Sequence, residues 1–225
     1  RVGAQFTESY RKVATRLNHH MRKRNQKVLL IASVAENEGK SSVAANLALA
    51  LAEKGKRVAL IDLDLKKPAQ YKIFDSPKAQ ETWLADYLTG KADVDNLLYY
   101  DEGTGLFHIF QNVGARNSGG LLESPRMRNV LQACRKSMDY VILDTAPMAL
   151  SSDAELLMKQ ADVGVLVVRQ DWTDIRAVND AADLIRQSGA DFGGFILNAF
   201  HREGIALSSS AGAYQRYGRK QAEEA

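Results

Sequence analysis

A Gly-Lys-Ser tripeptide at residues 39–41 has the residue types that bind phosphate groups. It follows an apolar run and precedes a helical pattern, where the N-terminus of a helix can bind an anion. At this position Lys40 would reach the outer phosphates of a nucleotide, and the Ser41 hydroxyl would ligate magnesium. The expected nucleotide-binding residues of this loop are Glu38, Gly39, Lys40, Ser41 and Ser42.

The setting of this tripeptide is more specific than the tripeptide itself. By average composition, a bare Gly-Lys-Ser/Thr arises by chance in about one chain in ten of this length. The full phosphate-loop pattern has a glycine where this sequence has Val34. Two further Gly-Lys pairs occur at 55–56 and 90–91. Neither is followed by a hydroxyl residue, and neither lies between an expected strand and an expected helix. The surroundings therefore favour a phosphate loop at Lys40.

Three aspartates that follow apolar runs could complete such a site. Asp62 and Asp64 close the second apolar run, and residues two apart in an extended chain point to the same side. Asp144 ends YVILD, and four apolar residues followed by Asp are typical of the second magnesium position of phosphate-loop proteins. A single acid after a strand is as often a loop cap, but three features at strand ends together indicate a metal–phosphate site. The expected magnesium ligands are Ser41, Asp62, Asp64 and Asp144.

Alternating apolar and helical patterns must position these residues. Strands are expected at 27–33, 57–62, 106–110, 139–144, 163–168 and 192–198. Helices are expected at 6–20, from 41 to about 55, around 124–136, near 153–160 and at about 174–188. Strands separated by helices predict an α/β fold with a mostly parallel sheet flanked by helices on both faces. Together with the phosphate-loop motif after the first strand, this resembles the fold of the phosphate-loop (P-loop) NTPases. We expect a helix and basic connector at 1–26 that is an appendage, a core domain at 27–200 and a tail at 201–225.

Composition excludes several classes of protein. The 225 residues are 45% hydrophobic and 25% charged, which is a globular profile and not a disordered or fibrous one. The longest apolar stretch, at 28–35, is well short of the roughly 20 residues that cross a bilayer. A single cysteine, Cys134, cannot form an internal disulfide, and no Cys/His spacing indicates zinc. A reducing cytoplasm is the expected compartment. We expect Trp83 and Trp172 to be packing residues.

The positive charge of the chain is concentrated at its start. Residues 1–27 carry a net charge of +7, which leaves −4 for the rest of the chain. The run Arg22-Lys23-Arg24 could face an anionic lipid surface, or it could be a solvated helix face and connector. No aromatic residues interleave with these bases to stack on nucleobases, so we expect no nucleic-acid partner.

The combination of these motifs resembles the bacterial tyrosine kinases of capsule and exopolysaccharide synthesis. The residues that carry the resemblance are GKS at 39–41, DLDLKKP at 62–68 and VILDTAP at 141–147. Further matches lie at 72–74, 84–90, 121–127, 153–154 and 166–169. The resemblance covers the chain from about residue 8 to residue 217.

The resemblance implies an ATP-dependent protein-tyrosine kinase that uses ATP and Mg²⁺. The residues that it places in catalysis are Lys40, Asp62 and Asp64, with Asp62 as the acid–base residue. The family phosphorylates tyrosines near its C-terminus, which here are Tyr214 and Tyr217. Asn198 matches a residue that contacts adenine in related ATPases, although a strand-end turn residue is an equally good interpretation.

The resemblance also implies partners and a location. They are other copies of the chain in a ring, with an octamer as one option, a membrane polysaccharide co-polymerase or activator, and a cognate tyrosine phosphatase. The expected location is the cytoplasm, at the inner face of the plasma membrane. Glu8 and Arg11 match two positions of the family's E-x-x-R-x-x-R oligomerisation motif, and Ala14 replaces its second arginine. Lys66 and Ala146 stand where the family usually has Arg and Pro.

Two other functions remain open at this point. One is an ATPase switch of the cell-division and plasmid-partition (MinD/ParA) class, which has the same architecture but hydrolyses ATP without phosphorylating tyrosine. Its signature lysine would fall at Ala35. The other is a catalytically silent module that binds a partner, against which the retained lysine and carboxylates argue.

Overall fold

The computed structural model describes residues 2–75 and 82–200, and side chains from residue 6 onward. Within these ranges the strands are β1 (Val28–Ser33), β2 (Val58–Leu63), β3 (Tyr99–Asp101), β4 (Leu106–Ile109), β5 (Tyr140–Thr145), β6 (Val163–Arg169) and β7 (Asp191–Asn198). The helices are α1 (Val2–Lys23), α2 (Lys40–Ala52), α3 (Gln70–Ile73), α4 (Leu84–Leu88), α5 (Ser118–Leu122), α6 (Pro125–Ser137), α7 (Asp153–Met158) and α8 (Ile175–Gln187).

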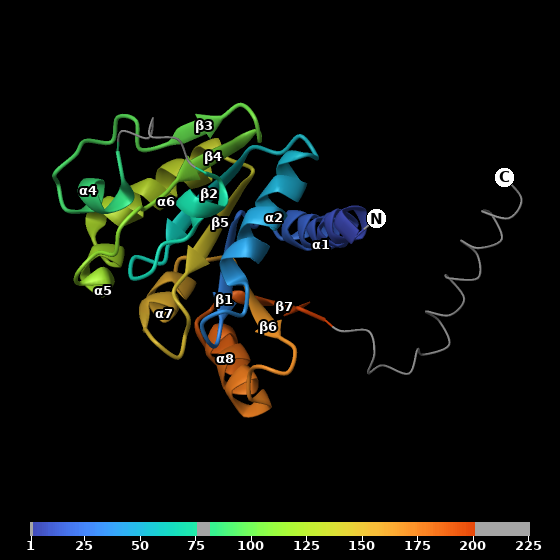
Figure 1. Cartoon of the computed structure of the whole chain (residues 1–225). Helices are drawn as coiled ribbons and strands as arrows, with labels where there is room; N and C mark the ends of the chain where they lie inside the picture. Colours follow the sequence, from blue (N-terminus) through green and yellow to red (C-terminus); the bar gives the residue numbers. More distant parts are fainter. Residues whose placement is uncertain (1, 76–81, 201–225) are drawn as a thin grey trace, which may run out of the picture.

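One sheet of the order β3-β4-β2-β5-β1-β6-β7 runs through the molecule (Figure 1). Its strand pairs are parallel except for the antiparallel pair of β3 and β4. The carboxyl ends of β1, β2 and β5 therefore meet at one edge, which is where open α/β sheets bind ligands. The predicted fold class is confirmed. The short edge strand β3 was not expected, because three half-exposed residues before a turn leave no apolar periodicity.

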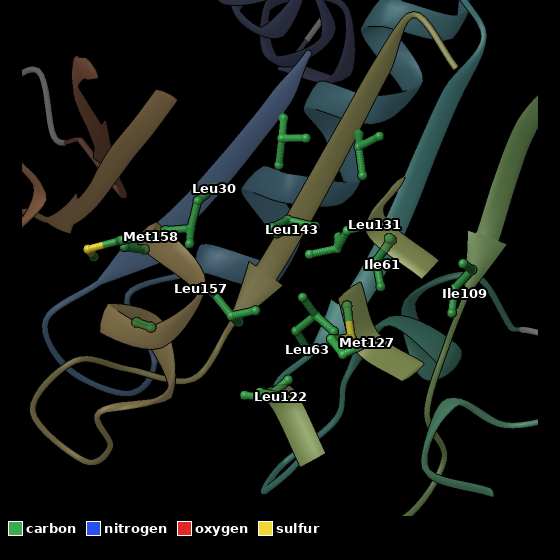
Figure 2. Close-up of a cluster of buried hydrophobic side chains, with 14 of the residues drawn as sticks. Leu30, Ile61, Leu63, Ile109, Leu122, Met127, Leu131, Leu143, Leu157 and Met158 are labelled. Carbon is green, nitrogen blue, oxygen red and sulfur yellow. The ribbon is translucent and has the colours of Figure 1, made fainter. Parts of the chain in front are cut away.

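The central strands are buried on both faces, as their uninterrupted apolar runs predict. All six residues of β1, β2 and β5 are buried. On one face these strands pack against α5, α6, α7 and α8, and Figure 2 shows part of this cluster, with Leu30, Ile61 and Leu143 facing Met127, Leu131 and Leu157. On the other face they pack against α2 and α1.

The N-terminal helix α1 is part of the packed body. Ala14 and Met21 are 0% and 1% exposed, and with Leu17 they join the cluster formed by α2 and the sheet. The expectation that this helix is an appendage is therefore wrong. The helix is amphipathic, and its apolar stripe is the face that covers α2. Figure 1 shows the two helices in contact. No helix in the described part of the chain has the length and apolar character needed to span a membrane.

Candidate functional site

A cavity of ≈ 950 Å³ opens at the carboxyl edge of the sheet, between the loops that follow β1, β2 and β5. The predicted site residues that line it are Glu38, Gly39, Lys40, Ser41, Ser42 and Asp64. Its volume is within the range of roughly 300–1,000 Å³ that ligand sites have. The strand-end residues that the sequence singles out therefore surround one cavity.

Side chains of the loop between β1 and α2 stabilise its conformation by packing into the core and by hydrogen bonding. Val34 is 7% exposed and belongs to the hydrophobic core, which explains why this position accommodates a valine in place of glycine. The buried carboxylate of Glu38 accepts a hydrogen bond from the Ala35 N–H (2.8 Å) and another from the Thr173 hydroxyl. The side chain of Glu38 therefore braces the loop, and its backbone contributes to the cavity wall.

Gly39 is required where the loop enters α2. Its φ of 85° is left-handed, and an added Cβ would lie 2.0 Å from Nδ2 of Asn198. That Asn198 amide, at the end of β7, donates a hydrogen bond to the Glu38 carbonyl (2.8 Å). Of the two interpretations of Asn198, the structure shows a strand-end brace of the phosphate loop, and contact with adenine remains a prediction.

Lys40 is the buried cation of the site. It is 5% exposed, its Nζ forms an ion pair with Oδ1 of Asp144, and it lies 3.4 Å from the Ser41 hydroxyl oxygen. The second oxygen of Asp144 accepts a hydrogen bond from Nε2 of Gln70 (2.7 Å). The same Gln70 amide donates to the Ser41 carbonyl (3.0 Å), and its own Oε1 has no partner. Gln70 thus joins the two halves of the site, although no motif in the sequence marks it.

Asp62 and Asp64 have different surroundings, although they are two residues apart. Asp62 pairs in register with Asp144 and is 0% exposed, and its Oδ2 accepts hydrogen bonds from the N–H groups of Ala69 and Gln70 (both 2.9 Å). Burial raises the pKa of Asp62 to about 8, and the charge of Asp144 adds to this rise, while the backbone donors and Lys40 oppose it. Asp64 lines the cavity, and burial also raises its pKa.

Magnesium fits the part of this site that faces the cavity. Among the described residues, no three His, Cys, Asp or Glu side chains converge as metal ligands. However, magnesium that is bound to nucleotide phosphates needs only one or two protein ligands. The Ser41 hydroxyl and the Asp64 carboxylate line the same cavity and can supply them. Asp62 and Asp144 lie behind this surface with other partners, so their place among the ligands remains a prediction.

The expectation that Trp172 is a packing residue is wrong. This side chain is 54% exposed and lines the cavity. Its indole N–H donates a hydrogen bond to the Glu36 carbonyl (3.2 Å), and the Arg169 guanidinium lies over its ring. In the sequence, Trp172 lies in a loop outside any apolar stripe, and this position could have indicated that it is not a core residue. Trp83, by contrast, packs against the core as expected. The predicted phosphoacceptors Tyr214 and Tyr217 lie outside the described residues.

Comparison with known proteins agrees with this geometry. The family model of the CobQ/CobB/MinD/ParA nucleotide binding domain matches residues 29–220. Tyrosine-protein kinase CpsD of Streptococcus agalactiae is 32% identical over 96% of this chain and 93% of its own length. The chain belongs to the bacterial tyrosine kinases. The family predicted from the sequence motifs is thereby confirmed. The protein is a protein-tyrosine kinase.

Solved structures show the same fold. The kinase domain of the Escherichia coli tyrosine kinase ETK matches this kinase with a TM-score of 0.82 and 27% identity, over 90% of this chain and 79% of that chain. The cell-division ATPase MinD of Pyrococcus furiosus, at 21% identity and a TM-score of 0.68 over 84% of this chain and 79% of that one, shares the fold. Tyrosine-protein kinase ptk of Acinetobacter johnsonii is 28% identical over 87% of this chain, which spans 26% of that longer protein.

Proposed function

We propose that this kinase is an ATP-dependent tyrosine autokinase that regulates the synthesis and export of capsular polysaccharide or exopolysaccharide. It phosphorylates Tyr214 and Tyr217 in the tail of another copy of the chain. The observation that carries the proposal is the cavity of ≈ 950 Å³ in which Lys40, Ser41 and Asp64 meet at the start of a helix. A chain that belongs to the tyrosine kinases and has this cavity has the groups for phosphoryl transfer.

Nucleotide binding would rearrange the buried charges. The ammonium of Lys40, which contacts Asp144, exchanges this partner for the β- and γ-phosphates, as the lysine of a phosphate loop does. Backbone N–H groups at the start of α2 and the positive end of that helix bind the same phosphates. Mg²⁺ held by Ser41 and Asp64 neutralises charge on the phosphate oxygens when bound.

The transfer step needs a base, because the tyrosine hydroxyl has a pKa near 10. The phenolic oxygen bonds to the γ-phosphorus, the bond from that phosphorus to the bridging oxygen breaks, and ADP leaves with that electron pair. Asp62 takes the phenolic proton. Burial raises the pKa of Asp62 to about 8, which makes its carboxylate a stronger base, and the fraction in this carboxylate form increases as pH rises toward 8. Both carboxylate oxygens accept backbone hydrogen bonds, Oδ1 from Asp64 and Oδ2 from Ala69 and Gln70, so this role requires that one of these oxygens is released.

Transfer would occur between subunits. About 17 residues separate Asn198 from the two tail tyrosines, and a fully extended segment of that length reaches about 55 Å. The exposed helix surface with Glu8 and Arg11 brings subunits together in a ring, for which an octamer is one arrangement. Arg11 forms an exposed ion pair with Glu53 of its own chain (3.0 Å), and such pairs contribute at most about 1 kcal/mol. This arginine can therefore exchange its partner for one on a neighbour.

Family membership supports a proposal for the cellular partners. They are a membrane polysaccharide co-polymerase or activator, which would hold the kinase at the inner face of the plasma membrane, and a tyrosine phosphatase that would reverse the reaction. Phosphates on the tail would loosen the ring by charge repulsion.

Mixing two defective chains tests the proposal. A Lys40→Met chain has the acceptor tyrosines but lacks the phosphate-binding lysine. A Tyr214→Phe/Tyr217→Phe chain keeps the lysine but lacks the acceptor tyrosines. With radiolabelled ATP, we expect label on tyrosine of the Lys40→Met chain only when the second chain is present. Lys91→Met, at an exposed lysine of another Gly-Lys pair, is the matched control and should behave as the parent chain does.

The alternative outcomes separate the competing functions. Release of free phosphate without labelled tyrosine would identify an ATPase switch. Neither product would identify a silent binding module. Label on the Lys40→Met chain alone, without its partner, would refute the assignment of Lys40. Thermal unfolding of each variant checks that the substitution at Lys40, which leaves Asp144 without its ion-pair partner, has not unfolded the chain.

A further inference from the structure

Two side chains, one at the end of β6 and one in the loop after it, donate hydrogen bonds to successive carbonyl groups of the phosphate loop. The indole N–H of Trp172 donates to the Glu36 carbonyl (3.2 Å). The guanidinium of Arg169 donates to the Asn37 carbonyl (3.0 Å), and its Cζ also lies over the Trp172 ring, 4.7 Å from the ring centre. The two donors therefore hold each other in place as well as the loop.

The next loop residue, Glu38, is bound through both its backbone and its side chain. Its carbonyl accepts a hydrogen bond from Nδ2 of Asn198 (2.8 Å), and its buried carboxylate accepts one from the Thr173 hydroxyl. The loop residues 36–38 are thus each bound by side chains that belong to β6, β7 or the loop between β6 and α8. These contacts come from residues more than 130 positions away in the chain.

This arrangement fixes the direction of the N–H groups of the loop. In a planar trans peptide, the N–H of one residue points opposite to the carbonyl of the residue before it. Holding the carbonyl groups of residues 36, 37 and 38 therefore orients the N–H groups of residues 37, 38 and 39. These residues line the nucleotide cavity directly before α2, where backbone N–H groups bind phosphate.

The backbone conformation that is held in this way is an uncommon one. Asn37 has a φ of 63° and Gly39 a φ of 85°, both in the left-handed region. Glycine adopts this region freely, whereas asparagine does so at a cost. The Arg169 guanidinium binds the carbonyl of Asn37 itself, so its hydrogen bond offsets that cost. The first glycine of the usual phosphate-loop pattern is also absent, because Val34 takes its place.

We propose that Arg169, Trp172 and Thr173 form a clamp that pre-organises the phosphate loop, so that its N–H groups face the phosphates before a nucleotide binds. Trp172 is a positioning residue, which acts on the phosphates through the loop. Its side chain is 54% exposed and belongs to neither hydrophobic cluster, so packing does not explain it. The inference deepens the proposed function and rests on it in assigning the cavity to a nucleotide. Because a pre-organised loop loses less entropy on binding, the clamp increases affinity for phosphate groups.

The first test removes one donor of the clamp from the full chain. Trp172→Phe keeps an aromatic ring for Arg169 but lacks the indole N–H. Titration calorimetry with pyrophosphate and with ADP, each with Mg²⁺, should show that the Kd of both ligands rises about fivefold, which is typical of one lost hydrogen bond. Pyrophosphate has neither base nor ribose, so an equal factor for both ligands places the effect at the phosphates. The thermal midpoint should not change, because the side chain is exposed.

Two further variants act as a second test and as its control. Thr173→Val removes the hydroxyl that binds the Glu38 carboxylate and should raise both Kd values in the same way. Thr104→Val also removes a hydroxyl from a carboxylate, that of Asp101, but away from the cavity, and should leave both Kd values within twofold. Trp83→Phe, at a tryptophan that packs against the core, should likewise leave both Kd values within twofold.

Kinetics distinguish positioning of the loop from participation in transfer. With the Lys40→Met chain as acceptor, Trp172→Phe and Thr173→Val should raise the KM for ATP by the same factor as the Kd of ADP. The kcat should stay within twofold, because an interaction that is equally strong before and during transfer affects binding alone. A fall in kcat with unchanged Kd values would place these residues in the transfer step and refute the clamp.

The remaining outcomes separate this inference from the function on which it rests. Weaker binding of ADP with unchanged binding of pyrophosphate would show that Trp172 contacts the nucleoside, and would refute the clamp. Unchanged affinity for both ligands would refute it too, as would a parent chain that does not bind pyrophosphate. Raised Kd values without labelled tyrosine in any mixture would refute the autokinase and leave the clamp standing. Labelled tyrosine with unchanged affinities would refute the clamp and leave the kinase standing.

Discussion

His108 shows how burial sets the charge of a single side chain in this protein. The imidazole is 1% exposed and lies among the rings of Phe74, Phe110 and Tyr99. Burial lowers the pKa of His108 to about 4, although the charge of Asp101 opposes this effect. The residue is therefore neutral in the folded state at physiological pH, and it belongs to the packing of β4 and not to the catalytic site.

This shift predicts how stability depends on pH. The unfolded chain takes up a proton at His108 near pH 6.5, but the folded chain does so only near pH 4, so the folded state loses stability as pH falls through this window. We expect the His108→Phe variant to lose about 2 kcal/mol less than the parent chain between pH 7.5 and pH 5, as measured by urea unfolding. The raised pKa of Asp62 acts in the opposite direction, but it is common to both chains and cancels in the comparison. Equal losses in both chains would show that His108 is not buried as a neutral group.

At the scale of elements, the contact between α1 and α2 decides what the N-terminal helix can do. Glu8 and Arg11 lie on its exposed surface, while Ala14 faces α2 and is 0% exposed. The arginine that the family's oligomerisation motif has at this position would here enter the hydrophobic cluster. Packing against α2 therefore favours a small side chain at residue 14.

This geometry predicts the effect of restoring the motif. Ala14→Arg should lower the free energy of unfolding by about 3 kcal/mol or more, because it forces a charge and a large side chain into a closed interface. Thr15→Arg, the same addition at the neighbouring exposed position, should change it by no more than about 0.5 kcal/mol. Chemical denaturation measures both. A stable Ala14→Arg chain that forms larger oligomers would mean that α1 can detach from α2.

At the scale of the whole molecule, the basic N-terminal region predicts weak attachment to an anionic membrane. Arg22, Lys23 and Arg24 are exposed at the end of α1. Each engaged base contributes on the order of 1 kcal/mol at an anionic surface, and salt screens this attraction. Arg24 already pairs with Asp191 (3.3 Å), so we expect the other two to contribute more.

The prediction is checked by co-sedimentation with phosphatidylserine vesicles. The parent chain should bind at low salt and lose binding at raised salt, and reversing the charge of residues 22–24 should weaken binding without changing nucleotide affinity. Reversal of the exposed lysines Lys91, Lys136 and Lys159 changes the net charge equally and should have little effect. Vesicle binding that is insensitive to the reversal at 22–24 would identify the basic run as a solvated connector.

The sequence by itself determined the strands of the sheet other than β3, and the edge at which the chemistry occurs. Strands such as β1 and β5 are uninterrupted apolar runs, and their periodicity is a local property that a sequence displays directly. Because parallel strands end at a common edge, the positions of Lys40, Asp64 and Asp144 after such runs were sufficient to place them together. The family resemblance rests on the same short motifs, which is why it too could be stated from the sequence.

Only the tertiary structure decided which of these groups face the cavity and which lie behind it. Asp62 and Asp64 are two residues apart, but backbone donors from the start of α3 enclose Asp62, and no local pattern contains that contact. Gln70 and Trp172 acquire their places in the site from elements far away in the chain. Burial and hydrogen bonding depend on such long-range packing, and a side chain's pKa and accessibility depend on both. The physical chemistry of the site is therefore a property of the folded molecule.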